Sequence, residues 1–203
     1  MNFEHWQHYA RAWLLHVFGR EDQAFKEYAA AYRIQPDDVQ AARHLAFIAA
    51  RKKHYDLADK WFIETLRLAP EDAETHFNHG YVLEQAGRAR ESIAAFAEAA
   101  RLRPSLDQAW YGLGLAHARL GEHVEAAAAF TKAAEQQPMN GDAFYQWGMA
   151  YHHANQPDKV EMVIQKLVKF DPKRALILMR DAQRSDLRHL VPIEVQRFFE
   201  SPR

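Results

Sequence analysis

Five prolines recur at one fixed interval along this chain of 203 residues. They are Pro36, Pro70, Pro104, Pro138 and Pro172, each 34 residues after the one before it, without an insertion or a deletion. A strict period of this length is typical of a repeat array, in which one supersecondary unit stacks on the next and no unit buries its apolar face alone. The spacing therefore predicts a chain built from repeated units rather than around one central core.

Other positions recur in the same frame. If each repeat ends two residues after its proline, the units are 5–38, 39–72, 73–106, 107–140 and 141–174. The eighth position is small in every unit: Ala12, Ala46, Gly80, Gly114 and Gly148. The twenty-fourth is large: Tyr28, Phe62, Phe96, Phe130 and Ile164. The fifteenth is Gly19, Lys53, Gly87, Gly121 and Asn155.

These positions predict a pair of helices in each repeat. Small residues let the two helices approach closely, and we expect the large twenty-fourth residue to fill the gap between repeats. Gly or Asn at the fifteenth position favours the left-handed conformation that ends a helix, and the proline stops the second helix. The apolar 3–4 spacing of Trp110, Leu113 and Gly114 agrees with helices between these points.

The openings of the third and fourth repeats, residues 73–80 and 109–114, resemble the tetratricopeptide repeat family. The resemblance covers about 5–174 and is weakest at the ends, where His8 and Arg11 stand in repeat one and Val160 in repeat five. It implies an all-α, right-handed solenoid (superhelix) of helix hairpins. Residues 175–203 are then expected to form a capping helix and a short C-terminal tail.

The segment after the last proline has its own apolar pattern. Arg174–Arg184 carries Ala175, Leu178 and Ala182 at the spacing of a sixth first helix. Two short apolar stripes follow: Leu187, Leu190 and Val191, then Val195, Phe198 and Phe199. Pro192 suits the start of a helical turn. Three alternatives stay open for this segment: it folds back on its own chain, pairs with another copy, or docks a partner.

The resemblance also implies a concave groove lined by the first helix of each repeat. The candidate groove residues are Tyr9, Trp13, Arg43, Phe47, Arg51, Phe77, Tyr81, Tyr111, Leu115, Arg119, Tyr145 and Met149. Aromatic residues, Met and Arg are enriched at recognition surfaces, and a contiguous apolar surface commonly marks a binding site. The alternatives are that these rings pack within the repeats, or lie under the tail or a second subunit.

The expected function is a non-catalytic scaffold or adaptor that binds a peptide or an amphipathic helix of a partner protein in this groove. Members of the family that grip acidic chaperone tails use Lys and Asn where this chain has mostly rings, so a clamp for such tails is not expected. Small secretion chaperones of the family use apolar grooves. The alternatives are a self-associating module, driven by Trp6, Trp13 and the Phe198–Phe199 tail, and an accessory subunit of an enzyme or secretion complex.

Several function classes lack support in the sequence. There is no glycine-rich phosphate loop, nucleophile elbow or metalloprotease helix, so neither an enzyme nor a cofactor is expected. The net charge of −1 argues against nucleic-acid binding, and no apolar run is long enough for membrane insertion. Without cysteine there is no disulfide, and the twelve histidines lack the supporting ligands of a metal site. Asp37–Asp38 and Glu71–Asp72 are expected to cap helices, and the cytoplasm is the expected compartment.

Overall fold

The computed structural model describes the backbone of residues 3–200 and the side chains of residues 3–197. Every regular element in this part of the chain is a helix. Contacts divide the chain into two compact units, Met1–Arg103 and Pro104–Arg203. None of the described helices is both long and apolar enough to cross a membrane.

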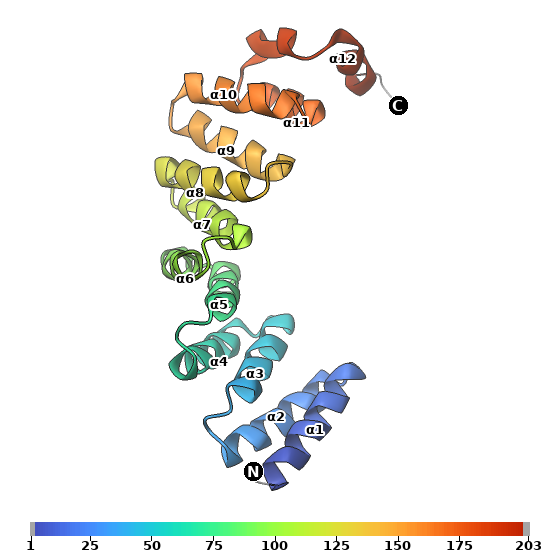
Figure 1. The fold of residues 1–203 in the computed structure, drawn as a ribbon, viewed down its shortest axis with the longest axis vertical. Coiled ribbons are helices and arrows are strands. Elements are labelled where there is room, and N and C mark those ends of the chain that lie inside the picture. The colour runs from blue at the N-terminus through green and yellow to red at the C-terminus, as the bar shows by residue number, and fades with distance from the viewer. Residues whose placement is uncertain (1–2, 201–203) are drawn as a thin grey trace. The chain divides into compact units, whose positions relative to one another are not determined.

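The first unit holds six helices that follow one another as hairpins (Figure 1). They are α1 (Phe3–Val17), α2 (Glu21–Ile34), α3 (Val39–Arg51), α4 (Tyr55–Leu68), α5 (Ala73–Gln85) and α6 (Ala89–Leu102). Within each hairpin the two helices pack together, and α2 also packs on α3 and α4 on α5. Each hairpin is therefore joined to the next one in this unit.

The second unit begins with two hairpins and ends in shorter helices. Its elements are α7 (Asp107–Arg119), α8 (His123–Gln136), α9 (Gly141–His153), α10 (Pro157–Val168), α11 (Pro172–Asp181), the 3-10 helix η1 (Ser185–Leu190) and α12 (Ile193–Glu200). Helix α9 packs on α8, α10 and α11. The core of this unit runs from Phe130 through Trp147 and Ile164 to Leu178.

The turn after the first helix of each pair has the predicted left-handed residue. Gly19, Gly87 and Gly121 have φ angles of 71°, 77° and 76°. Lys53 and Asn155 take the same conformation, with φ angles of 59° and 54°. The left-handed conformation costs roughly 1–2 kcal/mol for a residue with a side chain, such as lysine. The packing of the helices on either side therefore has to stabilise the turn at Lys53.

The large twenty-fourth residue of a repeat was expected to fill the gap between repeats, but in the third and fourth repeats it also makes a close contact within its own hairpin. A Cβ atom placed on Gly80 would lie 2.8 Å from the Phe96 ring, and one on Gly114 would lie 2.7 Å from the Phe130 ring. The twenty-fourth residue therefore packs against the small eighth residue of its own repeat, not only between repeats. It also reaches the next repeat, because Phe62 stacks on His79 with ring centroids 5.9 Å apart.

Aspartate side chains cap helices α3 and α5, as expected. Asp38 accepts hydrogen bonds from the backbone N–H groups of Gln40 and Ala41, and Asp72 accepts one from that of Glu74. These bonds satisfy donors that a helix N-terminus leaves without an intrahelical partner.

The helix after Pro172 starts earlier than predicted. It spans Pro172–Asp181 rather than Arg174–Arg184, because Asp171 caps it and Pro172 occupies its first turn. Ala175, Leu178 and Ala182 are buried as expected.

The C-terminal stripes pack on the second unit as far as they are described. Leu187 and Val191 are buried in its core, and Leu190 and Val195 lie against it. Of the three alternatives for this segment, folding back on its own chain is the one observed. The side chains of Phe198 and Phe199 lie outside the described residues.

Candidate functional site

The first unit contains an open pocket at the end of α3, beside the start of α4 and one face of α5. Its volume is about 480 Å³. The lining residues are Phe47, Ala50, Arg51, Lys53, Tyr55, Phe62, Asn78, Tyr81, Val82 and Gln85. Three of the predicted groove residues, Phe47, Arg51 and Tyr81, meet here, and we call this site the α3–α5 pocket.

Helical spacing brings these side chains to one place. Phe47 and Arg51 are four residues apart on α3, and Asn78, Tyr81 and Gln85 recur at intervals of three and four on α5, so each set lies on one face of its helix.

The apolar base of the pocket is formed by rings and an aliphatic side chain. Phe47 meets the buried ring of Phe62 edge-on, with centroids 5.8 Å apart and an interplanar angle of 84°. Val82 is also buried, whereas Tyr81 is 55% exposed. The α3–α5 pocket therefore has a fixed apolar base and one aromatic side chain open to a ligand.

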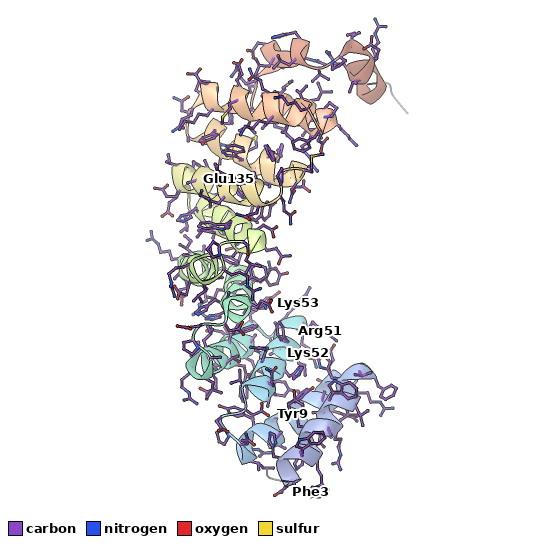
Figure 2. The ribbon with its side chains drawn as sticks, viewed as in Figure 1. Phe3, Tyr9, Arg51, Lys52, Lys53 and Glu135 are labelled. Atoms are coloured by element: carbon purple, nitrogen blue, oxygen red, sulfur yellow. The ribbon has the colours of Figure 1, made fainter. Side chains whose placement is uncertain are left out.

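Three consecutive cations stand at the end of α3. Arg51, Lys52 and Lys53 are labelled together in Figure 2. Arg51 forms an ion pair with Glu21, and Lys52 forms one with Asp22, which ties the end of α3 to the start of α2. Arg51 and Lys53 also line the pocket, so its rim is cationic on this side.

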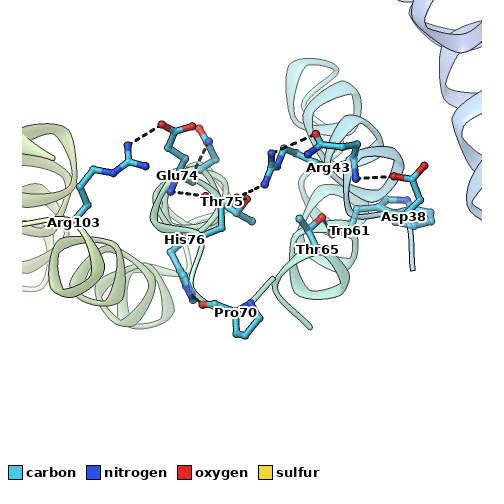
Figure 3. Close-up of polar contacts among 12 residues, drawn as sticks. Asp38, Arg43, Trp61, Thr65, Pro70, Glu74, Thr75, His76 and Arg103 are labelled. Atoms are coloured by element: carbon cyan, nitrogen blue, oxygen red, sulfur yellow. Dashed lines mark hydrogen bonds and ion pairs between the residues drawn. The ribbon is translucent and has the colours of Figure 1, made fainter. Parts of the chain in front are cut away.

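Arg43 has a structural role in this unit. Its guanidinium forms an ion pair with the carboxylate of Asp72, which also accepts a hydrogen bond from the Thr75 hydroxyl. Figure 3 labels Arg43 and Thr75. Burial alone would raise the pKa of Asp72, but the hydrogen bond from Thr75 and the charge of Arg43 lower it. Arg43 thus joins α3 to the cap of α5 and does not line the pocket.

The remaining candidates in the first unit are Tyr9, Trp13 and Phe77. Tyr9 packs edge-on against Tyr28, with centroids 5.4 Å apart, and burial raises its pKa. Phe77 packs against Phe96 at 5.9 Å. The rings of Tyr9 and Phe77 are thus half-buried against rings of their own repeats, which is the alternative of packing within the repeats. Trp13 is 52% exposed on α1.

The second unit holds the other five candidates. Tyr111 packs on Phe130 at 5.6 Å, and the Tyr145 hydroxyl donates a hydrogen bond of 2.9 Å to Asp181. Burial, and then Asp181, raises the pKa of Tyr145. Met149 is half-buried against the same core, while Leu115 and Arg119 are exposed. None of these five side chains lines the pocket of about 300 Å³ that the second unit contains.

Sequence reasoning missed part of the α3–α5 pocket and a pocket in the second unit. Lys53 was interpreted only as a turn residue, and Tyr55, at the start of α4, was not considered. A pocket of about 300 Å³ in the second unit is lined by Lys173, Leu176, Ile177, Met179, Arg180, Ser185 and Arg188. The spacing of Lys173, Ile177 and Arg180 along α11 could have indicated a shared face.

Several histidines form hydrogen bonds with acidic side chains or with backbone carbonyl groups. His5 contacts Asp38 at 2.8 Å and His79 contacts Asp59 at 2.6 Å. His76 contacts the carbonyl oxygen of Pro70 at 2.8 Å. Among the described residues, no group of three or more His, Cys, Asp or Glu side chains is placed to hold a metal ion.

Comparison with known proteins identifies the fold. A family model described as "Tetratricopeptide repeat" matches residues 77–141. The solved structure of YrrB, described as "a TPR protein with an unusual peptide-binding site", has a TM-score of 0.74 at 23% identity, covering 85% of this chain and 90% of that one. The MamA protein has a TM-score of 0.79 at 21% identity, covering 86% and 96%.

A further similar structure is MamA residues 41 to the end from Desulfovibrio magneticus RS-1, with a TM-score of 0.74 at 16% identity, covering 89% and 98%. No curated protein sequence matches the chain. The chain thus has the tetratricopeptide repeat fold, and residues 77–141 carry the sequence pattern of that family.

Proposed function

We propose that this protein is a non-catalytic interaction scaffold that binds a peptide segment of a partner protein in the α3–α5 pocket. The observation that carries the proposal is the combination in one pocket of an apolar base, the half-buried Phe47 over the buried Phe62, with the exposed ring of Tyr81 and a cationic rim of Lys53 and the Glu21-paired Arg51. An aromatic ring that is half exposed on a rigid helix offers contact area at a low cost in side-chain entropy.

The pocket favours a ligand of mixed chemistry. A large apolar side chain would lie on Phe47, beside the exposed ring of Tyr81, and an acidic side chain nearby would pair with Lys53, since Arg51 is already paired with Glu21. The amides of Asn78 and Gln85 would exchange hydrogen bonds with the peptide backbone. The preferred ligand is therefore a short segment that carries an apolar residue close to Asp or Glu.

The relationship to known structures supports a scaffold rather than an enzyme. YrrB, whose fold is similar, is described by its peptide-binding site. The α3–α5 pocket offers recognition chemistry, and its lining holds no acidic residue to serve as a general base. We propose that the protein acts without a cofactor in the cytoplasm.

Selection of random displayed peptides on the immobilised protein tests this proposal. Selected peptides should share a large apolar residue close to an acidic one. Their affinity, measured by fluorescence polarisation, should fall by about tenfold or more in Tyr81→Ala and in Lys53→Glu, since each change removes a contact with the peptide. Ile63→Ala is the matched control, because Ile63 is 54% exposed on α4 and lies outside the pocket. Equal affinity for all four proteins would refute the assignment.

A further inference from the structure

Helix α1 has an exposed apolar face that the proposed peptide site does not use. Its large exposed side chains are Phe3, Trp6, Trp13, Leu14 and Val17, and Phe18 follows directly after the helix. Their exposed fractions run from 49% for Leu14 to 76% for Phe3 and Phe18. None of them lines the α3–α5 pocket. We call these six residues, together with Ala10, the α1 stripe.

The stripe lies on the side of α1 that faces away from its own unit. Successive residues of a helix turn by about 100°, so positions 3, 6, 10, 13, 14 and 17 share one face. The buried residues of α1, His5 and Ala12, lie on the opposite face, where Tyr9 also packs against Tyr28. Figure 2 labels Phe3 and Tyr9 on this helix. The large side chains of the stripe are therefore about half or more exposed on this face.

The exposed area of the stripe is large enough for a stable interface. Aromatic side chains have about 150–250 Å² each to bury, so at the observed exposures the four rings of the stripe present roughly 550 Å². Leu14 and Val17 bring the total to roughly 700 Å², above the few hundred Å² that a monomer commonly exposes in one patch. A standard interface buries about 800 Å² on each partner, which matches this estimate.

Five positions of the stripe are symmetric about Ala10. In an antiparallel pair of helices centred on this residue, Phe3 would face Val17 of the other copy, and Trp6 would face Leu14. Trp13, by contrast, would face the polar residue Gln7 of the other copy. The small side chain of Ala10 would meet its own equivalent at the crossing point, where a small residue lets helices approach closely. A two-fold interface needs this self-complementarity, because each contact is made twice.

We propose that a second copy of this chain covers the α1 stripe, through antiparallel pairing of the two α1 helices about Ala10. The exposed polar residues Glu4, Gln7 and Arg11 lie at the edge of the stripe and form the rim of the interface. Trp13, a predicted groove residue, then belongs to the dimer rather than to the peptide site. Because the α3–α5 pocket takes no residue from α1, the dimer presents two peptide sites at once.

Sedimentation velocity across the micromolar range tests the pairing. The wild type should sediment as a dimer at the upper end of the range, and Trp6→Glu should remain a monomer with an unchanged circular dichroism spectrum, because Trp6 is exposed. Ile63→Glu, a change at an exposed apolar residue of α4, should dimerise like the wild type. A wild type that stays monomeric throughout, or an equal effect of both substitutions, overturns the proposal.

Engineered cysteines test the orientation, since the chain has none of its own. Facing Cα atoms at the crossing point of two close helices are about 5 Å apart, within the range of a disulfide, so Ala10→Cys should give a covalent dimer on mild oxidation. Val17→Cys should not, because at 1.5 Å per residue its two copies would lie roughly 21 Å apart. Cross-linking at both positions would indicate parallel pairing, and the absence of cross-linking at position 10 would exclude the antiparallel pair.

Discussion

The contact between Gly114 and Phe130 gives the sharpest test of how the repeats are packed. A Cβ atom at Gly114 would lie within 2.9 Å of three carbons of the Phe130 ring, and that ring is fully buried. At an exposed position inside a helix, replacing Gly by Ala stabilises a protein by about 1 kcal/mol. Here overpacking costs about 1–3 kcal/mol, so Gly114→Ala should lower the stability by about 1 kcal/mol net.

Thermal unfolding followed by circular dichroism measures this effect. The Tm of Gly114→Ala should fall by about 2–4 °C, the shift expected for 1 kcal/mol in a chain of this size, and Gly114→Leu should lower it further. In a Phe130→Leu background the same Gly114→Ala change should stabilise, because the obstructing ring atoms are gone. The two sites should thus couple by about 2 kcal/mol.

An exposed alanine supplies the control for helix propensity. Ala128 lies on α8 with its side chain exposed, so Ala128→Gly should cost about 1 kcal/mol with no packing term. If Gly114→Ala raised the Tm by the amount that Ala128→Gly lowers it, there would be no close contact at Gly114. The packing described for both Gly80 and Gly114 would then be wrong.

Further predictions concern caps and titrating groups in the first unit. Asp38→Ala should cost about 1–2 kcal/mol, measured by urea denaturation, because it removes the cap of α3, and Asp38→Asn should retain most of that stability. His44 stacks on Tyr28 at 4.5 Å, and burial, followed by the positive charge of His16, lowers its pKa. The neutral form of His44 therefore contributes stability above about pH 6.5, and this stability is lost as the pH falls through the lowered pKa. The free energy of unfolding of His44→Phe should fall less between about pH 7 and pH 5 than that of the wild type. Burial would raise the pKa of Asp59, but hydrogen bonds from Arg88 and His79 lower it. The stability that the Asp59 carboxylate contributes is therefore lost in acid below about pH 4. An Asp59→Asn variant with an unchanged acid unfolding profile would contradict this.

The parts of the fold that depend on local conformation could be predicted from the sequence. Gly87 and Asn155 mark the ends of first helices because few other residues adopt a positive φ easily, and Asp38 marks a start because its short carboxylate reaches the free N–H groups. Pro172 could not be assigned by period alone, since a proline ends one helix or begins the next. The preceding Asp171 was the signal that it begins α11.

The candidate site was less predictable because side-chain burial depends on neighbours that are distant in sequence. Tyr81 and Phe77 are four residues apart on the same helix, yet Tyr81 is exposed and Phe77 packs on Phe96. Arg43, expected as a groove residue, forms an ion pair with Asp72 from the next repeat, which the sequence did not indicate. A periodic sequence identifies the face of each helix, but not which side chains on that face are covered by a neighbouring ring or charge.

Affinity capture from a native lysate tests whether a partner protein binds in the α3–α5 pocket. The wild type is compared with the double variant Phe47→Ala/Tyr81→Ala and with the control Ile63→Ala, all shown to be folded by circular dichroism. We expect a protein that is retained by the wild type and the control and lost with the double variant. Equal recovery of the same proteins on all three would show that this pocket is not the binding site.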